Sequence, residues 1–298
     1  MARLLLEILP VPSQTERIAD LKSWLAGQQP VLGKQWVATL EDRKREEAEF
    51  HNADREGHRD ESRESSPNRR FYESFTIVEA HIHAWIRHHA AAGAFLDYAC
   101  GNGRLGRMAA EHGAKVVVGI DISDVSVQNA SERAAQTGFG DVAHFLQRDC
   151  EDTQLPADRF DACLCSGMLH HLDLARAFPE LHRIMAPGGR ILAVEALSYN
   201  PFIQLYRRLT PRLRTEFEAR HILGMNEVRQ AERWFTVENL RFFLMAAPLA
   251  TLLPAGAIRR SAIRAGHALD AVLTRIPGVR LWSWVFTFEL VKKPFAPA

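Results

Sequence analysis

From residue 94 onward, short strand-like segments alternate with helix-like segments, and this alternation is the feature that most constrains the fold. The segments AFLDYA, KVVVGIDIS, AHFLQRD, RFDACLCSG and GRILAVEAL are short and apolar, and single helical patterns separate most of them. Such an alternation predicts an α/β fold, in which a parallel sheet is covered by helices on both faces. Ligands of these sheets bind at the carboxyl ends of the strands.

After Ser198 the pattern changes. An Arg-rich helical stretch and a second helix near 226–233 precede a strand near 240–245 and an Ala- and Arg-rich helix. The final stretch LWSWVFTFELVKK alternates with a period of two, which predicts a closing strand. The sheet should therefore gain two late strands, with helical insertions between them and the core.

Three regions follow from these patterns. Residues 1–89 form an N-terminal helical and charged region with a lid, and residues 90–198 form the ligand-binding core. Residues 199–298 contribute helical insertions on the substrate side and the last two strands. Within the first region, residues 41–66 hold ten acidic and six basic residues with almost nothing apolar. This composition predicts an exposed helix or a mobile segment rather than part of the core.

Composition places the 298-residue chain, with 47% apolar and 24% charged residues, among soluble globular proteins. A net charge of +1 provides no global field to attract nucleic acid. The four cysteines form no C-x-x-C pair, so no metal site is expected and a reducing, cytoplasmic setting is favoured. The N-terminus MARLLLEILPVP has too short an apolar run for a signal peptide.

Two late segments leave alternatives open. The uncharged run FFLMAAPLATLLPAGAI, followed by Arg259 and Arg260, is interrupted by two prolines and a glycine. A buried strand followed by an apolar loop or lid is favoured over peripheral membrane contact through residues 242–260. The arginines within 207–214 are interpreted as a solvated helix face, with binding of an anionic or lipid-linked acceptor as the alternative.

The stretch FLDYACGNGRLG is the part of the sequence that says most about the ligand. Gly101, Gly103 and Gly106 match the G-x-G-x-x-G turn of dinucleotide-binding proteins, but Asp97 ends the strand before it. A carboxylate there would repel a pyrophosphate and attract a cationic amino group or sulfonium. Asp97 as a cap of the turn or of the next helix is the structural alternative.

FLDYACGNGR resembles the first motif of class I S-adenosylmethionine-dependent methyltransferases, whose acidic residue and alternate glycines fall on Asp97, Ala99, Gly101 and Gly103, with Asn102 in the same turn. Ala99 departs from the family's glycine by one methyl group. The resemblance covers residues 90–198. It implies a Rossmann-like doubly wound sheet of about seven strands, the last antiparallel, with N-terminal helices and a helical insertion after the fifth strand. The implied cofactor is S-adenosylmethionine, with S-adenosylhomocysteine as product.

Later motifs of the same resemblance assign further cofactor contacts. In GIDIS, Asp121 ends the second strand, where its carboxylate accepts the ribose hydroxyls, and Ile122 packs on the adenine. In LQRDCEDTQLP, Asp149 accepts the adenine amino group and the backbone amide of Cys150 meets the ring. The alternative for Asp149 is a solvated loop acid.

The fourth-strand motif FDACLCSGMLHHL places Ser166 beside the reactive sulfonium. His170 and His171 point about 100° apart on a helix, so at most one faces the pocket. His170 is the candidate general base, with packing or hydrogen bonding at a helix start as its alternative. Tyr72 precedes the helix that enters the first strand and is a candidate to close over the cofactor, with simple packing as the alternative.

These residues predict an enzyme of small-molecule biosynthesis that transfers a methyl group by in-line displacement to an O, N, S or C atom. A base is needed only where the acceptor loses a proton. An NAD(P)-dependent oxidoreductase and a non-catalytic S-adenosylmethionine-binding protein remain alternatives. A nucleic-acid methyltransferase is disfavoured because SGML stands where [DNS]-P-P-[YFW] is expected. The chain is expected to act as a monomer or homodimer on a small-molecule acceptor.

Overall fold

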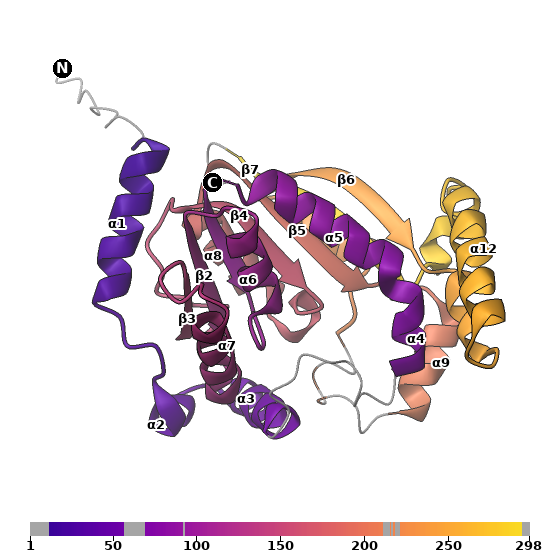
Figure 1. Ribbon diagram of the computed structural model, residues 1–298, viewed down its shortest axis with the longest axis horizontal. Coiled ribbons are helices and arrows are strands. Elements are labelled where there is room, and N and C mark those ends of the chain that lie inside the picture. The colour runs from indigo at the N-terminus through magenta and orange to yellow at the C-terminus, as the bar shows by residue number, and fades with distance from the viewer. Residues whose placement is uncertain are drawn as a thin grey trace, which may run out of the picture.

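A single mixed sheet of seven strands organises the molecule (Figure 1). The computed structural model describes residues 12–56, 69–91, 93–210, 215, 217 and 221–293. The strands are β1 (Ala94–Tyr98), β2 (Val116–Asp121), β3 (Ala143–Gln147), β4 (Phe160–Ser166), β5 (Met185–Ala196), β6 (Phe235–Phe243) and β7 (Val285–Lys292). Their order in the sheet is β3-β2-β1-β4-β5-β7-β6.

The strand directions confirm the predicted α/β class. Strands β1 to β5 pair in parallel, whereas β7 is antiparallel to both β5 and β6. The closing strand is therefore the antiparallel one, as expected. Strand β6 begins at Phe235, several residues before the predicted start near Leu240, because Thr236 and Val237 pair with β7.

Helices cover both faces of the sheet. They are α1 (Gln14–Ala26), α2 (Gly33–Val37), α3 (Asp42–Arg55), α4 (Arg69–Tyr72), α5 (Thr76–His89), α6 (Arg104–Glu111), α7 (Asp124–Gln136), α8 (Leu174–Ile184), α9 (Pro201–Leu209), α11 (Met225–Ala231) and α12 (Ala257–Leu273). Short 3₁₀ helices are η2 (Glu73–Phe75), η3 (Leu169–His171), η5 (Ala247–Leu252) and η6 (Val279–Trp282). Helices α9 and α11 form the predicted insertion after the fifth strand.

The sheet separates two apolar cores. One core joins the sheet to α5, α6 and α7, which lie in front of it in Figure 1. The other joins the opposite face to α8, α11 and α1. Because the parallel strands are covered on both sides, the side chains of β1 and β2 are all buried. The edge at the carboxyl ends of the strands is left for loops and for α3.

The prediction of exposure for residues 41–66 is wrong for its helical part. Helix α3 buries Lys44, Glu47 and Ala48, whose relative exposures are 6%, 5% and 0%. Charged side chains are buried there because they meet opposite charges on the loops of the sheet, which a composition count does not reveal. The remainder of that segment, residues 57–66, lies outside the described residues.

The uncharged run near residue 250 contains the predicted strand end and loop, and membrane contact through residues 242–260 stays an alternative. Strand β6 ends at Phe243, and the run continues as a loop and η5 before α12 begins. Among the helices of the described ranges, none is both long and apolar enough to cross a membrane. The division of the chain at residues 89 and 198 stays a prediction.

Candidate cofactor and acceptor site

A cavity of about 150 Å³ lies at the carboxyl ends of β1, β2 and β4. The loops after these strands form one wall, and α3 forms the opposite wall with Arg43, Lys44, Glu47, His51 and Arg55. The strand-side wall brings together most of the residues predicted to bind the cofactor: Ala99, Gly101, Asp121, Ile122, Asp149, Cys150 and Ser166.

The turn after β1 has the backbone shape that its sequence predicts. Ala99, Gly101 and Gly103 all have positive φ, at 56°, 51° and 73°. A Cβ on Gly103 would lie 2.6 Å from the Phe145 ring, so both conformation and space require glycine there. Ala99 adopts the left-handed region despite its methyl group, where the family motif has glycine.

Asp97 is buried directly behind this turn, with 3% relative exposure. Its Oδ2 accepts the backbone N–H of Gly106 at 2.7 Å, so it anchors the first turn of α6. Burial raises the pKa of Asp97 to about 7, against the hydrogen bond from Gly106, which lowers it. The capping alternative is therefore confirmed as one role. A second role toward a cationic ligand stays a prediction.

Asp121 organises the ribose side of the cavity. Its Oδ2 accepts the N–H of Gly101 at 2.8 Å, and its Oδ1 accepts the N–H of Ser123 at 2.9 Å. Each carboxylate oxygen has a second lone pair, so both remain able to accept a ligand hydroxyl. Beside it, the buried Ser126 Oγ has no hydrogen-bond partner within the described residues, although Ser126 lines the cavity. A polar ligand would satisfy that hydroxyl.

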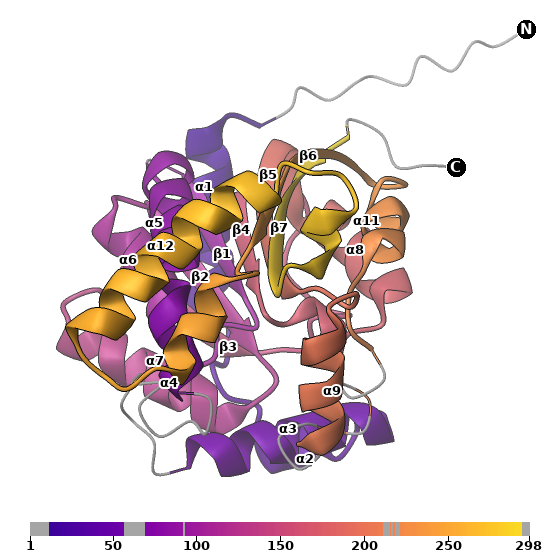
Figure 2. The ribbon, with the colours of Figure 1, turned by 90° about the vertical axis from the view of Figure 1, so that its right-hand side faces the viewer.

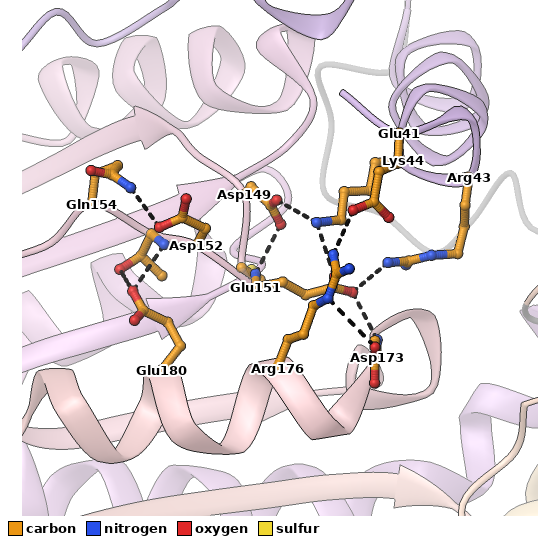
Figure 3. Close-up of polar contacts among 12 residues, drawn as sticks. Glu41, Arg43, Lys44, Asp149, Glu151, Asp152, Gln154, Asp173, Arg176 and Glu180 are labelled. Carbon is orange, nitrogen blue, oxygen red and sulfur yellow. Dashed lines mark hydrogen bonds and ion pairs between the residues drawn. The ribbon is translucent and has the colours of Figure 1, made fainter. Parts of the chain in front are cut away.

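A buried ion-pair network joins α3 to the loop after β3 (Figure 3). Lys44 Nζ lies 2.6 Å from Asp149 Oδ2 and 2.9 Å from Glu151 Oε2, and Arg43 lies 2.5 Å from Glu151 Oε1. Burial acts to lower the pKa of Lys44, but the two carboxylates outweigh it and raise that pKa. Asp149 is thus a buried, paired acid and not a solvated one.

Helix α3 also covers the glycine turn. A Cβ built on Gly101 would lie 2.6 Å from Arg55 Nη1, so this guanidinium packs directly over the turn. Pockets for small molecules typically enclose about 300–1,000 Å³. The cavity of about 150 Å³ is smaller because the side chains of α3 extend into it. Its residue types fit a nucleoside ligand, whose entry requires Lys44 and Arg55 to move aside.

Glu47, His51 and His171 form a compact group at the α3 side of the cavity. Their donor atoms lie within 4.8 Å of one another, and His171 Nδ1 is 3.0 Å from Glu47 Oε2. Burial opposes ionisation of Glu47, yet hydrogen bonds from His171, His51 and Thr215 hold its pKa far below the usual range. Burial lowers the pKa of His171, against the opposing effect of Glu47. Near neutral pH the pair is therefore a carboxylate and a neutral imidazole.

The neighbouring His170 points elsewhere. Its Nδ1 lies 2.7 Å from Glu195 Oε2, while Glu195 Oε1 accepts the backbone N–H groups of Met168 and Leu169. Glu195 therefore fixes the loop after β4. His171 lines the cavity and His170 is absent from its lining, so only one of the two faces the pocket, as expected. The base role of His170 stays a prediction, and the geometry favours His171.

Four residues predicted to bind the cofactor, Tyr72, Asp97, Asn102 and Gly103, do not line the cavity. Tyr72 ends α4, with its ring 5.3 Å from that of Phe75. The backbone oxygen of Asn102 accepts from Arg107 Nη1 at 2.8 Å. The contacts of Tyr72 correspond to its packing alternative, and its role over the cofactor stays a prediction.

Sequence reasoning missed the whole α3 wall. Lys44, Glu47, His51 and Arg55 recur at spacings of three and four residues, which places them on one face of a helix. That periodicity was the available signal, and Ala48 beside it marks the packed side. A search for apolar periodicity does not detect this face of α3, because the residues that face the rest of the protein are polar.

Comparison with known proteins gives the family of the central part of the chain. Residues 95–189 match the family model described as "Methyltransferase domain". This segment runs from β1 to the start of β5 and includes most of the strand-side wall of the cavity. The match favours methyl transfer over the nicotinamide alternative.

Curated relatives align with part of the chain. Protein arginine N-methyltransferase 1 of Saccharomyces cerevisiae is 38% identical over 26% of this chain and 22% of its own length. Demethylmenaquinone methyltransferase of Symbiobacterium thermophilum is 29% identical over 38% of this chain and 45% of its own length. The chain spans less than half the length of these relatives.

A solved structure extends the likeness of the fold. The geranyl diphosphate C-methyltransferase of Streptomyces coelicolor aligns with a TM-score of 0.57 at 15% identity, over 86% of this chain and 100% of its own. At that identity the likeness concerns the fold alone. The domain match and the strand order together identify residues 95–189 as a methyltransferase domain of the class I S-adenosylmethionine-dependent type.

Proposed function

We propose that the chain is an S-adenosylmethionine-dependent methyltransferase that acts on a small-molecule acceptor. The observation that carries this proposal is the convergence of Ala99, Gly101, Asp121, Asp149 and Ser166 on one cavity beneath the ionisable wall of α3. These residues come from the ends of four strands, β1 to β4, and match the family motif by motif. The acceptor and the methylated atom belong to the proposal as well.

The strand-side wall suits the cofactor. When bound, S-adenosylmethionine supplies an electrophilic methyl group on a cationic sulfur. Asp121 would accept the ribose hydroxyls, and Asp149 would accept the adenine amino group once Lys44 withdraws. Asp97 would attract the amino group of the methionine portion through its charge. Ser166 would lie beside the sulfur.

The α3 side suits an acceptor that loses a proton. With Glu47 ionised and His171 neutral, Nδ1 of His171 donates to Glu47 Oε2 and the lone pair of Nε2 can take a proton. The carboxylate then stabilises the imidazolium that forms. Arg43 and Lys44 line the same cavity and oppose a second cation there, so we assign this group to proton transfer rather than to a metal.

The cationic side chains of α3 also favour one class of acceptor. Arg43, Lys44 and Arg55 line the cavity, and they would attract an acceptor with an anionic group. Helix α3 closes over the strand ends, which limits access of water and keeps the nucleophile aligned with the methyl group. We therefore propose a hydroxyl-bearing, anionic small molecule as the acceptor class.

Isothermal titration of the purified chain with S-adenosylmethionine and with NAD tests the cofactor. We expect S-adenosylmethionine to bind and Asp121→Ala to lose at least about 100-fold in affinity, because the ribose and the Gly101 turn both lose their acceptor. Asp141→Asn is the matched control, since Asp141 is exposed and lies outside the cavity. Tight binding of NAD without binding of S-adenosylmethionine would overturn the proposal.

Transfer of a radiolabelled methyl group to a panel of hydroxyl, amine and thiol acceptors tests catalysis. Labelled product that requires His171 supports the base assignment. Cofactor binding without transfer to any acceptor in the panel would favour the non-catalytic alternative.

A further inference from the structure

Exposed apolar side chains gather on one side of the molecule, away from the cavity residues. Among the described residues, every exposed large apolar side chain except Ile77 lies between residues 199 and 282. They belong to α9, η5, α12 and η6. Figure 2 shows α12 and α9 on the side that faces the viewer. This concentration in one part of the chain needs an explanation, because single exposed apolar residues are otherwise scattered over a protein surface.

Helix α12 turns an apolar stripe toward solvent. Ile258, Leu269 and Val272 are 78%, 50% and 57% exposed, and their spacing places them on one helix face. The opposite face is packed, since Ile263 and Asp270 are buried on it, with relative exposures of 6% and 4%. Helix α12 therefore has an apolar face exposed to solvent in addition to the face that packs against the protein.

Helix α9 repeats this arrangement. Phe202, Leu205 and Leu209 are 73%, 55% and 72% exposed and recur at spacings of three and four residues. Trp282 of η6 is 56% exposed on the same C-terminal part of the chain. Aromatic and aliphatic residues of this kind are typical of helices that insert into the boundary between lipid headgroups and acyl chains.

The segments that carry these apolar residues are rich in arginine, of which Arg259 forms an ion pair with Glu73 of η2 at 2.8 Å. Residues 199–214 and 249–282 contain nine arginines and a single acidic residue, Asp270. Asp270 is buried, where its carboxylate accepts the backbone N–H groups of Met245, Ala246 and Ala247. The described arginines Arg260, Arg264 and Arg275 are exposed on or just after α12. The chain as a whole carries only +1, so this excess is local.

We infer that this basic apolar surface, formed by α9, η5, α12 and η6, docks on an anionic phospholipid bilayer. Arginines flanking an apolar stripe complement anionic headgroups above an acyl interior, and each adjacent basic residue favours binding. A second copy of the chain fits less well, because a symmetric contact would place the same arginines against one another.

The surface is connected to the cavity. Helix α9 ends at Leu209, and Thr215 a few residues later donates a hydrogen bond from its hydroxyl to Glu47 in the α3 wall. Only a few residues of the chain therefore separate α9, which would contact the bilayer, from a contact with the cavity wall. Docking itself does not depend on the proposed methyl transfer.

Vesicle flotation with the full chain tests the inference in the absence of any methyl donor. We expect the protein to float with vesicles of phosphatidylcholine containing phosphatidylglycerol, and to remain unbound with phosphatidylcholine alone. The variant Arg260→Glu/Arg264→Glu should lower the bound fraction on the order of tenfold or more, and raised salt should do the same. Leu269→Glu/Val272→Glu should abolish flotation.

Arg87→Glu is the matched control, since Arg87 is exposed near the far end of α5 and outside this surface; it should float like the unchanged chain. Circular dichroism verifies that each variant folds. Equal behaviour with both vesicle types, or equal loss in Arg87→Glu and Arg260→Glu/Arg264→Glu, would overturn the inference. A dimer in light scattering that Leu269→Glu/Val272→Glu separates would assign the surface to a second copy instead.

Discussion

The two walls of the cavity differ in how they are built. The strand-side wall consists of residues that directly follow β1, β2, β3 and β4, so each position is fixed by a turn a few residues long. The opposite wall is α3, which precedes β1 by about forty residues in the chain and meets the sheet only through side chains. The first wall has a motif for every strand end, and the second has none.

We propose that this difference separates cofactor binding from reactivity. The strand side offers the acceptors Asp121 and Asp149, which are suited to a nucleoside. The α3 side offers Glu47, His51 and several cations, which are suited to an acceptor and its proton. A family motif therefore describes the cofactor half, whereas the half that would distinguish this protein from its relatives comes from tertiary packing.

Separate substitution of the two adjacent histidines, His170 and His171, is the strongest test of that division. His171→Asn should reduce kcat by about 10²- to 10⁴-fold because the general base is removed, measured as methyl transfer at saturating cofactor. The unchanged enzyme should lose kcat as pH falls below the ordinary histidine range, since burial lowers the pKa of His171 and only its neutral form accepts a proton.

His170→Asn is the control for this exchange. It should retain most of kcat and keep the same pH profile, because His170 contacts Glu195 and not the cavity. A larger loss in His170→Asn than in His171→Asn would restore the base predicted from the sequence.

Removal of Lys44 tests whether α3 is part of the folded core. Lys44→Met leaves two buried carboxylates, Asp149 and Glu151, without their shared cation, and should lower the free energy of unfolding by about 3 kcal/mol. Denaturant titration measures it. Lys34→Met, at an exposed position of α2, should change stability by less than about 0.5 kcal/mol. Equal small effects would mean that α3 is not anchored by this network.

The pH dependence of stability tests the environment of Asp97, which lies behind the turn after β1. Because burial raises the folded pKa to about 7, the protonated form is favoured in the folded state, and the resulting stability is lost as pH rises from 4 through 7. Asp97→Asn should remove roughly 2 kcal/mol of the pH dependence between pH 5 and 8. Thermal unfolding at several pH values measures it. A variant with an unchanged slope would show that Asp97 is already ionised by a neighbouring cation.

Ala99 gives the smallest effect. A non-glycine residue at φ 56° is strained, so Ala99→Gly should stabilise the chain by about 0.5–1 kcal/mol. Ala135→Gly, in the last turn of α7, is the control and should destabilise by up to about 1 kcal/mol. Destabilisation of both variants would mean that the methyl group of Ala99 makes packing contacts that outweigh its strain.

Much of the fold could be predicted from the sequence, because the strand and helix periods of residues 94–198 are local. The class, the two late strands and the antiparallel closing strand are confirmed. Segment 41–66 shows where local reasoning fails. Its charges predict solvent exposure, but the acids after β3 and the cations of α3 neutralise one another in the interior.

The sequence by itself determined the strand-side site, since a turn after a parallel strand fixes both the backbone shape and the side chains that face a ligand. Only the tertiary structure decided which histidine faces the cavity, which helix covers it and which apolar residues stay outside. Those outcomes depend on contacts between segments far apart in the chain. Their energies come from pairing buried charges and filling space, and neither a family motif nor an apolar period reveals these contacts in the sequence.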